Sequence, residues 1–289
     1  MKQGRIIKVI SNQYTIFSEG SLYMAHPRGR MRKGDKPLVG DVVNFEEIED
    51  SVRIDSILPR RNVLLRPSVC NVDQALIVTS LKDPDFSPRL LNRLIFLVVL
   101  CNIEPVICIT KADLLDETQR AEVEKELDWY RKAGYRMFYS NPGSNDDELS
   151  ENLEGKITVL CGQSGAGKSS LLNRLDPTFK LHTQEISKAL GRGKHTTRHC
   201  ELHPVAGGLV ADTPGFSSLD FTRMDVEHLD ELLVDFKPYL EEGCRFADCI
   251  HVDEPDCIIK ENVKAGNINP TLYEDYCMIM REFKNRKKY

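Results

Sequence analysis

The chain has 289 residues, 41% of them hydrophobic and 29% charged, a composition typical of globular proteins with room for two or three domains. Its most apolar run, LIFLVVLC at 94–101, is far shorter than the roughly 20 residues that span a bilayer. The N-terminus lacks the apolar core of a signal peptide, and an odd count of nine cysteines argues against a disulfide framework. We therefore expect a cytoplasmic protein that does not enter a membrane.

The net charge of −5 is unevenly distributed. Residues 1–66 hold 12 Lys or Arg against 8 Asp or Glu, whereas the rest of the chain holds 27 against 36. A second basic cluster, KNRKK, lies at 284–288. Local basic patches bind phosphates even on acidic proteins, although a charged tail is more often only solvated. Charge alone therefore selects no partner.

Residues 1–66 contain five short, β-rich runs separated by turn residues, which indicate a small barrel. An OB-fold, a barrel that often binds oligonucleotides, fits this pattern. An SH3-like barrel fits it equally, and a barrel that only packs on its neighbour is a further alternative. The runs lie at 4–10, 14–17, 21–26, 38–48 and 52–58.

Residues 67–220 alternate between strand and helix patterns, which predicts an α/β domain with a mainly parallel sheet and helices on both faces. Residues 221–289 form a third segment, with a helix-like stretch, a Cys/His cluster and a helical, basic C-terminus. The predicted strands of the middle segment lie at 73–80, 104–110, 155–161 and 207–212, and its predicted helices at 88–100, 117–134 and 168–175.

The stretch "GQSGAGKSS" at 162–170 matches the phosphate-loop pattern G-x-x-x-x-G-K-[ST] between a predicted strand and a predicted helix. Glycines let backbone N–H groups point at phosphate oxygens, and the helix N-terminus adds its dipole. Lys168 is predicted to bind the β- and γ-phosphates, and the Ser169 hydroxyl to coordinate Mg²⁺. A glycine-rich turn without a ligand is the alternative. The predicted nucleotide-binding residues are Gly162, Gln163, Ser164, Gly165, Ala166, Gly167, Lys168, Ser169 and Ser170.

Two downstream motifs are typical of nucleotide switches. In "GGLVADTPG", Asp212 can hold the Mg²⁺ shell and the Gly215 N–H can sense the γ-phosphate. The stretch "GRGKHTTRH" at 191–199 lies between this motif and the phosphate loop. We predict that Thr197 coordinates Mg²⁺ there, with Thr196 as the alternative.

Phe216 stands where many GTPases carry a glutamine that orients the attacking water. Phenylalanine cannot make those hydrogen bonds, so another group has to position the water. His195 in the predicted switch is our candidate, and contact of His195 with RNA or solvent is the alternative. The predicted catalytic residues are His195, Lys168 and Thr197.

The tetrad "TKAD" ends a predicted strand well before the phosphate loop. The Asp113 carboxylate can accept hydrogen bonds from the guanine ring N–H and exocyclic NH₂, a pair that adenine does not offer. Thr110 replaces the usual asparagine, with fewer hydrogen-bonding groups. Base motif, phosphate loop and switches thus form a complete but rotated set, which is possible where the original ends of a sheet lie close together. The predicted base-binding residues are Thr110, Lys111, Ala112, Asp113 and, through its backbone, Ser140.

The stretch "CRFADCIHVDEPDC" at 244–257 places three cysteines and a histidine close together. Three thiolates and an imidazole make a closed tetrahedral set that suits a structural Zn²⁺ and leaves no open position for catalysis. A group of reactive or buried cysteines is the alternative. The predicted zinc ligands are Cys244, Cys249, His251 and Cys257.

The rotated motif order, the N-terminal barrel and the Cys/His cluster together resemble the RsgA family, the ribosome small subunit-dependent, circularly permuted GTPases. The resemblance covers essentially the whole chain. It implies an RNA-binding OB-fold at 1–66, a circularly permuted GTPase domain at 67–220 and a zinc-binding domain at 221–289. The family also has a hydrophobic residue in place of the catalytic glutamine, matching Phe216, and a switch histidine at the position of His195.

The same resemblance implies what the protein does. It would bind the small ribosomal subunit and its 16S-type rRNA, assist late subunit maturation, and hydrolyse GTP to GDP and phosphate when stimulated by the ribosome. GTP or GDP, Mg²⁺ and one structural Zn²⁺ are the implied ligands, and we expect a monomer. Two other classes stay open: a phosphate-loop kinase or ATPase, which has no use for TKAD, and an RNA-binding module in which nucleotide is only structural.

Overall fold

The computed structural model describes residues 1–28, 36–48, 51–65, 68–177, 200–212, 221 and 224–286. The chain forms two compact units, and each unit combines segments that are distant in the sequence. The first unit takes its described residues from 1–75, 146–161 and 168–216, and the second from 76–145, 162–167 and 217–289.

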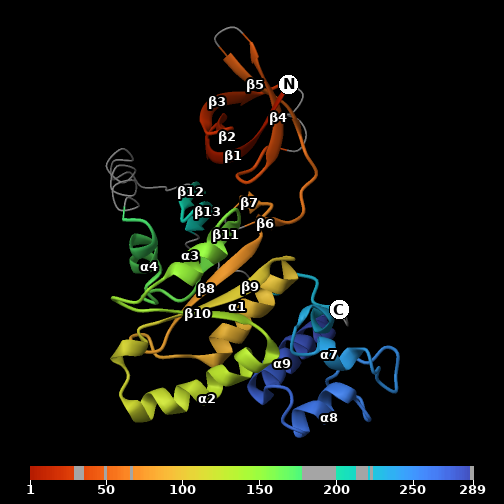
Figure 1. Ribbon diagram of the computed structural model, residues 1–289. Helices are drawn as coiled ribbons and strands as arrows, with labels where there is room; N and C mark the ends of the chain where they lie inside the picture. The colour runs from red at the N-terminus through yellow and green to blue at the C-terminus, as the bar shows by residue number, and fades with distance from the viewer. Residues whose placement is uncertain are drawn as a thin grey trace. The chain divides into compact units, whose positions relative to one another are not determined.

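The first five strands close into a barrel with the order β1-β2-β3-β5-β4 (Figure 1). β3 and β5 pair in parallel, and the other neighbours pair antiparallel. This is the strand order of an OB-fold, so that prediction is confirmed and the SH3-like alternative is wrong. Ile6, Ile16, Phe45 and Ile54 fill the interior. The strands are β1 (Lys2–Ile10), β2 (Gln13–Ser18), β3 (Ser21–Pro27), β4 (Val42–Ile48) and β5 (Ser51–Ile57).

The strand predicted at 38–48 begins only at Val42. Gly40 has a φ of +94°, a left-handed conformation that ends strand geometry. A β-carbon at this position would lie 2.0 Å from the Cys70 carbonyl oxygen, so the close approach of the two backbones requires glycine. Cys70 ends a small hairpin, β6 (Val63–Leu65) and β7 (Ser68–Cys70), that the sequence pattern did not predict.

A six-stranded sheet with the order β10-β9-β8-β11-β13-β12 carries the α/β part of the chain. β9 pairs in parallel with β10, and β11 with β13, whereas β12 joins the edge antiparallel. The prediction of a mainly parallel sheet is confirmed, and β12 was not foreseen. The strands are β8 (Gln74–Ser80), β9 (Glu104–Thr110), β10 (Arg136–Ser140), β11 (Ile157–Cys161), β12 (Leu202–Val205) and β13 (Gly208–Asp212).

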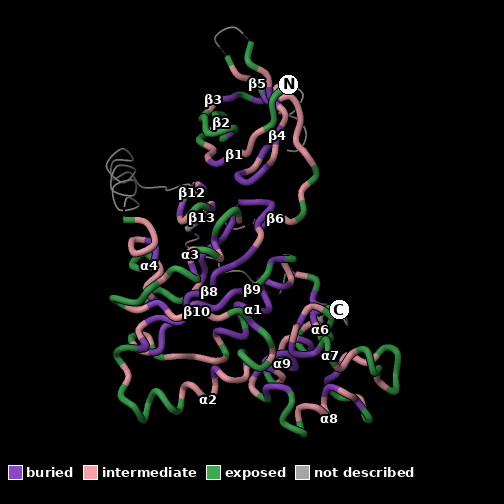
Figure 2. Tube along the Cα trace, in the orientation of Figure 1, coloured by how far each residue is buried: buried purple, intermediate pink, exposed green. Residues whose placement is uncertain are grey.

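The helices of this part begin and end at clear local signals. The Ser87 hydroxyl caps α1, proline occupies its first turn, and the helix spans the predicted residues. Asp116 and Gln119 form a capping box at the start of α2. α1 packs against β9, and β9 and the neighbouring β8 are buried over most of their length (Figure 2). The helices are α1 (Pro88–Leu100), α2 (Glu117–Ala133), α3 (Asp147–Leu153) and α4 (Lys168–Leu175).

The C-terminal helices belong to the second unit, where α1 packs against both α6 and α9. Asn92 on α1 is fully buried, donates a hydrogen bond to Asp275 on α9 and accepts one from the Tyr130 hydroxyl of α2. The Tyr135 hydroxyl donates to the Asp235 carboxylate at 2.6 Å, and burial raises the pKa of Asp235 to about 6. The helices are α6 (Leu229–Leu232), α7 (Lys237–Leu240), α8 (Ile258–Lys264) and α9 (Pro270–Arg286).

None of the helices in the described part of the chain combines the length and apolar character that a membrane-spanning helix needs.

Candidate functional site

The TKAD tetrad lies where β9 ends and the chain turns sharply. Thr110 is the last residue of the strand and is 3% exposed. Lys111 adopts a left-handed conformation with a φ of +59°, and a short 3₁₀ helix, η2 (Ala112–Leu114), follows. The Asp113 side chain is exposed in the first turn of η2. The turn thus buries the first residue of the tetrad and leaves the last one accessible.

The Thr110 hydroxyl donates a hydrogen bond to the main-chain carbonyl oxygen of Ala166 at 2.7 Å. Ala166 is a buried residue of the phosphate loop, and it lies far from Thr110 in the sequence. The structure therefore brings the predicted base motif and residues 162–167 of the phosphate loop together within the second unit.

The backbone conformation of the phosphate loop depends on its glycines. Gly162, Gly165 and Gly167 all have positive φ values, of +136°, +82° and +92°. A β-carbon on Gly162 would lie 2.1 Å from the Val78 carbonyl oxygen of β8. A loop of this kind turns successive N–H groups inward and forms an anion-binding concavity. α4 begins at Lys168, so Lys168, Ser169 and Ser170 form its first turn.

Two residues that the sequence reasoning missed hold the base motif in place. The Asn141 side-chain oxygen accepts a hydrogen bond of 2.9 Å from the Ala112 N–H. The Lys111 ammonium group donates to the Asp83 carbonyl oxygen. Asn141 directly follows Ser140, which pairs in register with Thr110. An asparagine between a strand and Pro-Gly is a common turn signal that singles out this position.

The predicted switches are only partly described. Asp212 is the last residue of β13 and lies in register with Leu160 of β11, but its side chain is outside the described part. His195, Thr196, Thr197, Gly215 and Phe216 also lie outside the described residues.

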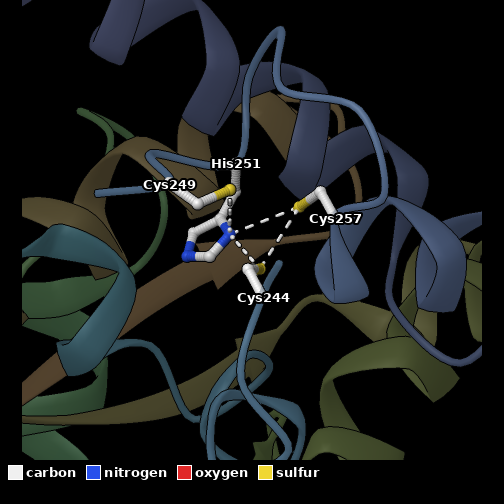
Figure 3. Close-up of side chains that lie close together, drawn as sticks. All are labelled: Cys244, Cys249, His251 and Cys257. Atoms are coloured by element: carbon white, nitrogen blue, oxygen red, sulfur yellow. Dashed lines mark hydrogen bonds between the residues drawn. The ribbon is translucent and has the colours of Figure 1, made fainter. Parts of the chain in front are cut away.

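The four predicted metal ligands come together in the C-terminal segment (Figure 3). Their ligand atoms all lie within 4.8 Å of one another. The His251 Nδ1 atom is 3.5, 3.5 and 3.3 Å from the sulfurs of Cys244, Cys249 and Cys257. The sulfurs of Cys244 and Cys257 are 3.9 Å apart.

These separations fit a tetrahedral metal ion. Bonds of about 2.3 Å to sulfur and about 2.0 Å to nitrogen place ligand atoms roughly 3.5–3.8 Å apart around Zn²⁺. Burial raises the pKa of the Cys257 thiol, but hydrogen bonds, first of all with His251, outweigh burial and lower it to about 7. Burial raises the pKa of the neighbouring Cys249 thiol to about 12, so the capacity for a metal follows from the donor set and its spacing and not from the thiol pKa values. The cluster can therefore hold a metal ion.

Comparison with known proteins assigns the chain to a family. The family model for the RsgA GTPase matches residues 57–222, and the model for the RsgA N-terminal domain matches residues 3–52. The chain belongs to the RsgA GTPase family. It is therefore a GTP hydrolase, with GTP, GDP and Mg²⁺ as the ligands that this family implies.

Curated RsgA proteins match the chain over nearly their whole length. The "small ribosomal subunit biogenesis GTPase RsgA" of Geobacillus kaustophilus is 45% identical, and the match covers 99% of both chains. The protein of the same name from Geobacillus thermodenitrificans is 46% identical over the same shares. Shouchella clausii RsgA is 43% identical over 100% of this chain and 99% of its own.

Two solved structures share the architecture of this chain. YloQ, described as a circularly permuted GTPase, has a TM-score of 0.84 and 38% identity, and the match covers 99% of this chain and 96% of YloQ. YjeQ from Thermotoga maritima also has a TM-score of 0.84, with 34% identity over 97% of this chain and 98% of its own. The predicted circular permutation of the GTPase domain is thereby confirmed.

Proposed function

We propose that this GTPase binds the small ribosomal subunit and its 16S-type rRNA in the cytoplasm and hydrolyses GTP during late maturation of the subunit. The observation that carries the proposal is the hydrogen bond between Thr110 and Ala166, which joins a guanine-type base motif to a phosphate loop. A kinase or ATPase has no use for that pairing. The names of the curated relatives supply the ribosomal partner.

The nucleotide lies on the base motif and the phosphate loop. Asp113 accepts from the guanine edge, the Lys111 stem lies along the base, and the Ser140 backbone adds a second base contact. The positive-φ glycines of the loop support this role because they turn N–H groups toward phosphate oxygens. The loop contacts come from Gly162, Gln163, Ser164, Gly165, Ala166, Gly167, Lys168, Ser169 and Ser170.

Hydroxyl and carboxylate oxygens, the donors that Mg²⁺ prefers, come from Ser169, Thr197 and Asp212. Bound Mg²⁺ neutralises charge on the β- and γ-phosphates. Lys168 holds the same phosphates, and the Gly215 N–H senses the γ-phosphate. His195 positions the attacking water, because Phe216 cannot. A slow intrinsic rate that the ribosomal partner raises follows from that arrangement.

We further propose that the bound metal is one structural Zn²⁺, because three thiols and an imidazole leave no position open for a substrate. The domains are an RNA-binding barrel at 1–66, the permuted GTPase domain at 67–220 and the zinc-binding domain at 221–289, acting as a monomer.

The outer face of the barrel supports RNA binding. Phe17, Leu22 and Met24 are 42%, 63% and 50% exposed, and Phe17 pairs in register with Leu22 across β2 and β3. This is the face with which OB-folds bind oligonucleotides, and exposed aromatic rings stack on bases.

The deciding experiment measures GTP and ATP hydrolysis with and without small ribosomal subunits, across a salt series. We expect the subunits to accelerate hydrolysis of GTP but not of ATP. The acceleration should fall steeply with salt, because binding through phosphate contacts releases counterions. Phe17→Ala should reduce the stimulation more than Met278→Ala, a matched change of an exposed apolar residue on α9. Unchanged GTP hydrolysis in the presence of subunits would contradict the proposal, and preferred turnover of ATP would return the chain to the ATPase alternative.

A further inference from the structure

The imidazole of His251 lies between two different environments. The ring is buried, and its Nδ1 atom faces the three cysteine sulfurs at 3.3–3.5 Å. Figure 3 shows that the other ring nitrogen points away from the cysteines. That nitrogen, Nε2, lies 3.2 Å from a carboxylate oxygen of Asp230, which comes from α6 and precedes His251 by 21 residues.

We infer that Asp230 is a positioning residue of the metal site, an outer-shell carboxylate that holds His251 as a ligand. The inference rests on the metal site proposed above. A metal on Nδ1 requires a neutral imidazole, so the ring proton must sit on Nε2. The Asp230 carboxylate accepts a hydrogen bond from that N–H, which fixes the tautomer, orients the ring and makes Nδ1 a stronger donor.

The fold holds the carboxylate in place. Leu229, the preceding residue, is fully buried, and α6 packs against α1. The Asp230 side chain is only 16% exposed, so water competes weakly for its oxygens. The fold of this segment therefore holds Asp230 facing His251.

Other contacts fix the backbone and the face of the histidine but leave Nε2 to Asp230. The Tyr273 hydroxyl donates to the His251 carbonyl oxygen at 2.9 Å, and the Tyr276 hydroxyl donates to that of Ile250 at 3.0 Å. The Phe236 ring meets the imidazole edge-on, with centroids 6.4 Å apart. α9 thus places the loop, whereas Asp230 sets the direction in which the ring nitrogen points.

A competing account treats the pair as an ordinary buried ion pair between a carboxylate and a protonated histidine. That pair would stabilise the metal-free chain and would be lost when metal binds Nδ1. The two accounts therefore predict effects in opposite states of the protein. An outer-shell role appears as weaker metal binding, and an ion pair appears as a less stable metal-free protein.

The test compares Asp230→Asn and Asp230→Ala with wild type in the full-length chain. Zn²⁺ affinity is measured by competition with a chromogenic chelator, and ligand geometry by the absorption spectrum of the Co²⁺-loaded chain. Glu231→Gln is the matched control, because Glu231 is the next residue on the same helix but is exposed and pairs with His228. We expect Asp230→Ala to weaken Zn²⁺ binding about 10- to 100-fold. Asn keeps an acceptor without the charge, so Asp230→Asn should lie in between, and the control should match wild type.

Thermal unfolding with Zn²⁺ and with chelator separates the two accounts. Destabilisation of Asp230→Asn mainly in the Zn²⁺-loaded state supports the inference, and destabilisation mainly in chelator overturns it. If wild type and Asp230→Ala bind Zn²⁺ equally tightly, the inference about Asp230 is wrong, but the proposed metal site stands. A wild-type chain that takes up no Zn²⁺ overturns the proposed metal site and this inference with it.

Discussion

The side-chain hydroxyl of Thr110 and the main-chain carbonyl oxygen of Ala166 are 2.7 Å apart and hydrogen-bonded. The bond joins the end of β9 to the phosphate loop in the interior of the second unit, with Thr110 3% exposed. A threonine has one hydroxyl proton to donate, and here it is directed at the loop. We therefore propose that the first residue of the tetrad orders the phosphate loop, and that Lys111, Asp113 and the Ser140 backbone contact the base.

Thr110→Val removes this hydrogen bond while keeping the shape of the side chain. A buried carbonyl left without its donor destabilises the ordered loop by about 1–3 kcal/mol. Since GDP binds the ordered loop, GDP binding has to overcome this additional cost. We expect the GDP dissociation constant to rise about fivefold to 100-fold, measured with a fluorescent analogue. Thr110→Ser keeps the hydroxyl and should stay near wild type. Equal GDP affinities of the Val and Ser variants would show that the hydrogen bond from Thr110 to Ala166 does not order the loop.

Asp113→Asn replaces an acceptor-only carboxylate with a neutral amide, half of which donates. Hydrogen bonds to a charged group contribute about 1.5–3 kcal/mol each, so GTP affinity should fall at least about tenfold while ATP affinity stays the same. Competition binding with GTP and ATP measures the ratio of the two affinities in each variant. Glu117→Gln, a nearby change of an exposed carboxylate, is the control. An unchanged preference for GTP would remove Asp113 from the base site.

Lys168→Ala removes the cation that we propose binds the β- and γ-phosphates. Loss of one preorganised donor to developing charge costs about 100-fold or more in rate, so single-turnover GTP hydrolysis should be abolished in practice. Lys125→Ala, at an exposed position on α2, should hydrolyse GTP like wild type. Near-normal turnover by Lys168→Ala would refute the site assignment.

The Asp235 carboxyl should make stability depend on pH. Its pKa is raised by burial from the ordinary value of 3.8 to about 6, so the folded chain binds this proton more tightly than the unfolded chain. The contribution of Asp235 to stability therefore falls as pH rises from about 4 to about 6, and then stays constant. The loss amounts to about 3 kcal/mol.

Asp235→Asn is neutral at every pH and can still accept the hydrogen bond from Tyr135. Relative to wild type, it should be unchanged near pH 4 and more stable by up to about 3 kcal/mol above pH 6. Urea unfolding of both chains at several pH values gives the difference. A stability difference between the two chains that is the same at every pH in this range would show that folding does not raise the pKa of Asp235.

The elements with strong local signals could be predicted from the sequence. α1 has a serine cap and a proline at its start, and its predicted residues match the structure. The strand at 104–110 also matches, because Pro105 near its start is followed by four apolar residues in a row, Val106 to Ile109. The seven-residue helix α3 and the four-residue strand β12 were missed, since both are too short for a clear period and depend on packing.

In the candidate site, too, contiguous motifs could be predicted from the sequence, whereas contacts between distant residues could not. The phosphate loop, the tetrad and the Cys/His cluster are contiguous patterns, so spacing alone predicted them. The hydrogen bond from Ala112 to Asn141 and the contact of Asp230 with His251 join residues far apart in the sequence. Such partners are set by tertiary structure, and neither Asn141 nor Asp230 belongs to a motif that spacing could detect. Thr110 was assigned to the base, and only the fold shows that its hydroxyl turns toward the loop.

Asn92 constrains how this sequence can evolve. Its amide satisfies both the Tyr130 hydroxyl and the Asp275 carboxylate, on two other helices. An apolar residue at position 92 would leave the buried Tyr130 hydroxyl without this acceptor and would remove one partner of Asp275, which also pairs with Arg89. A change at position 275 would leave the Asn92 amide without this acceptor. Acceptable changes at these three positions are therefore coupled. Homologous sequences should keep all three residues or replace them together. Substitutions in α9 should therefore be accompanied by substitutions in α1 and α2.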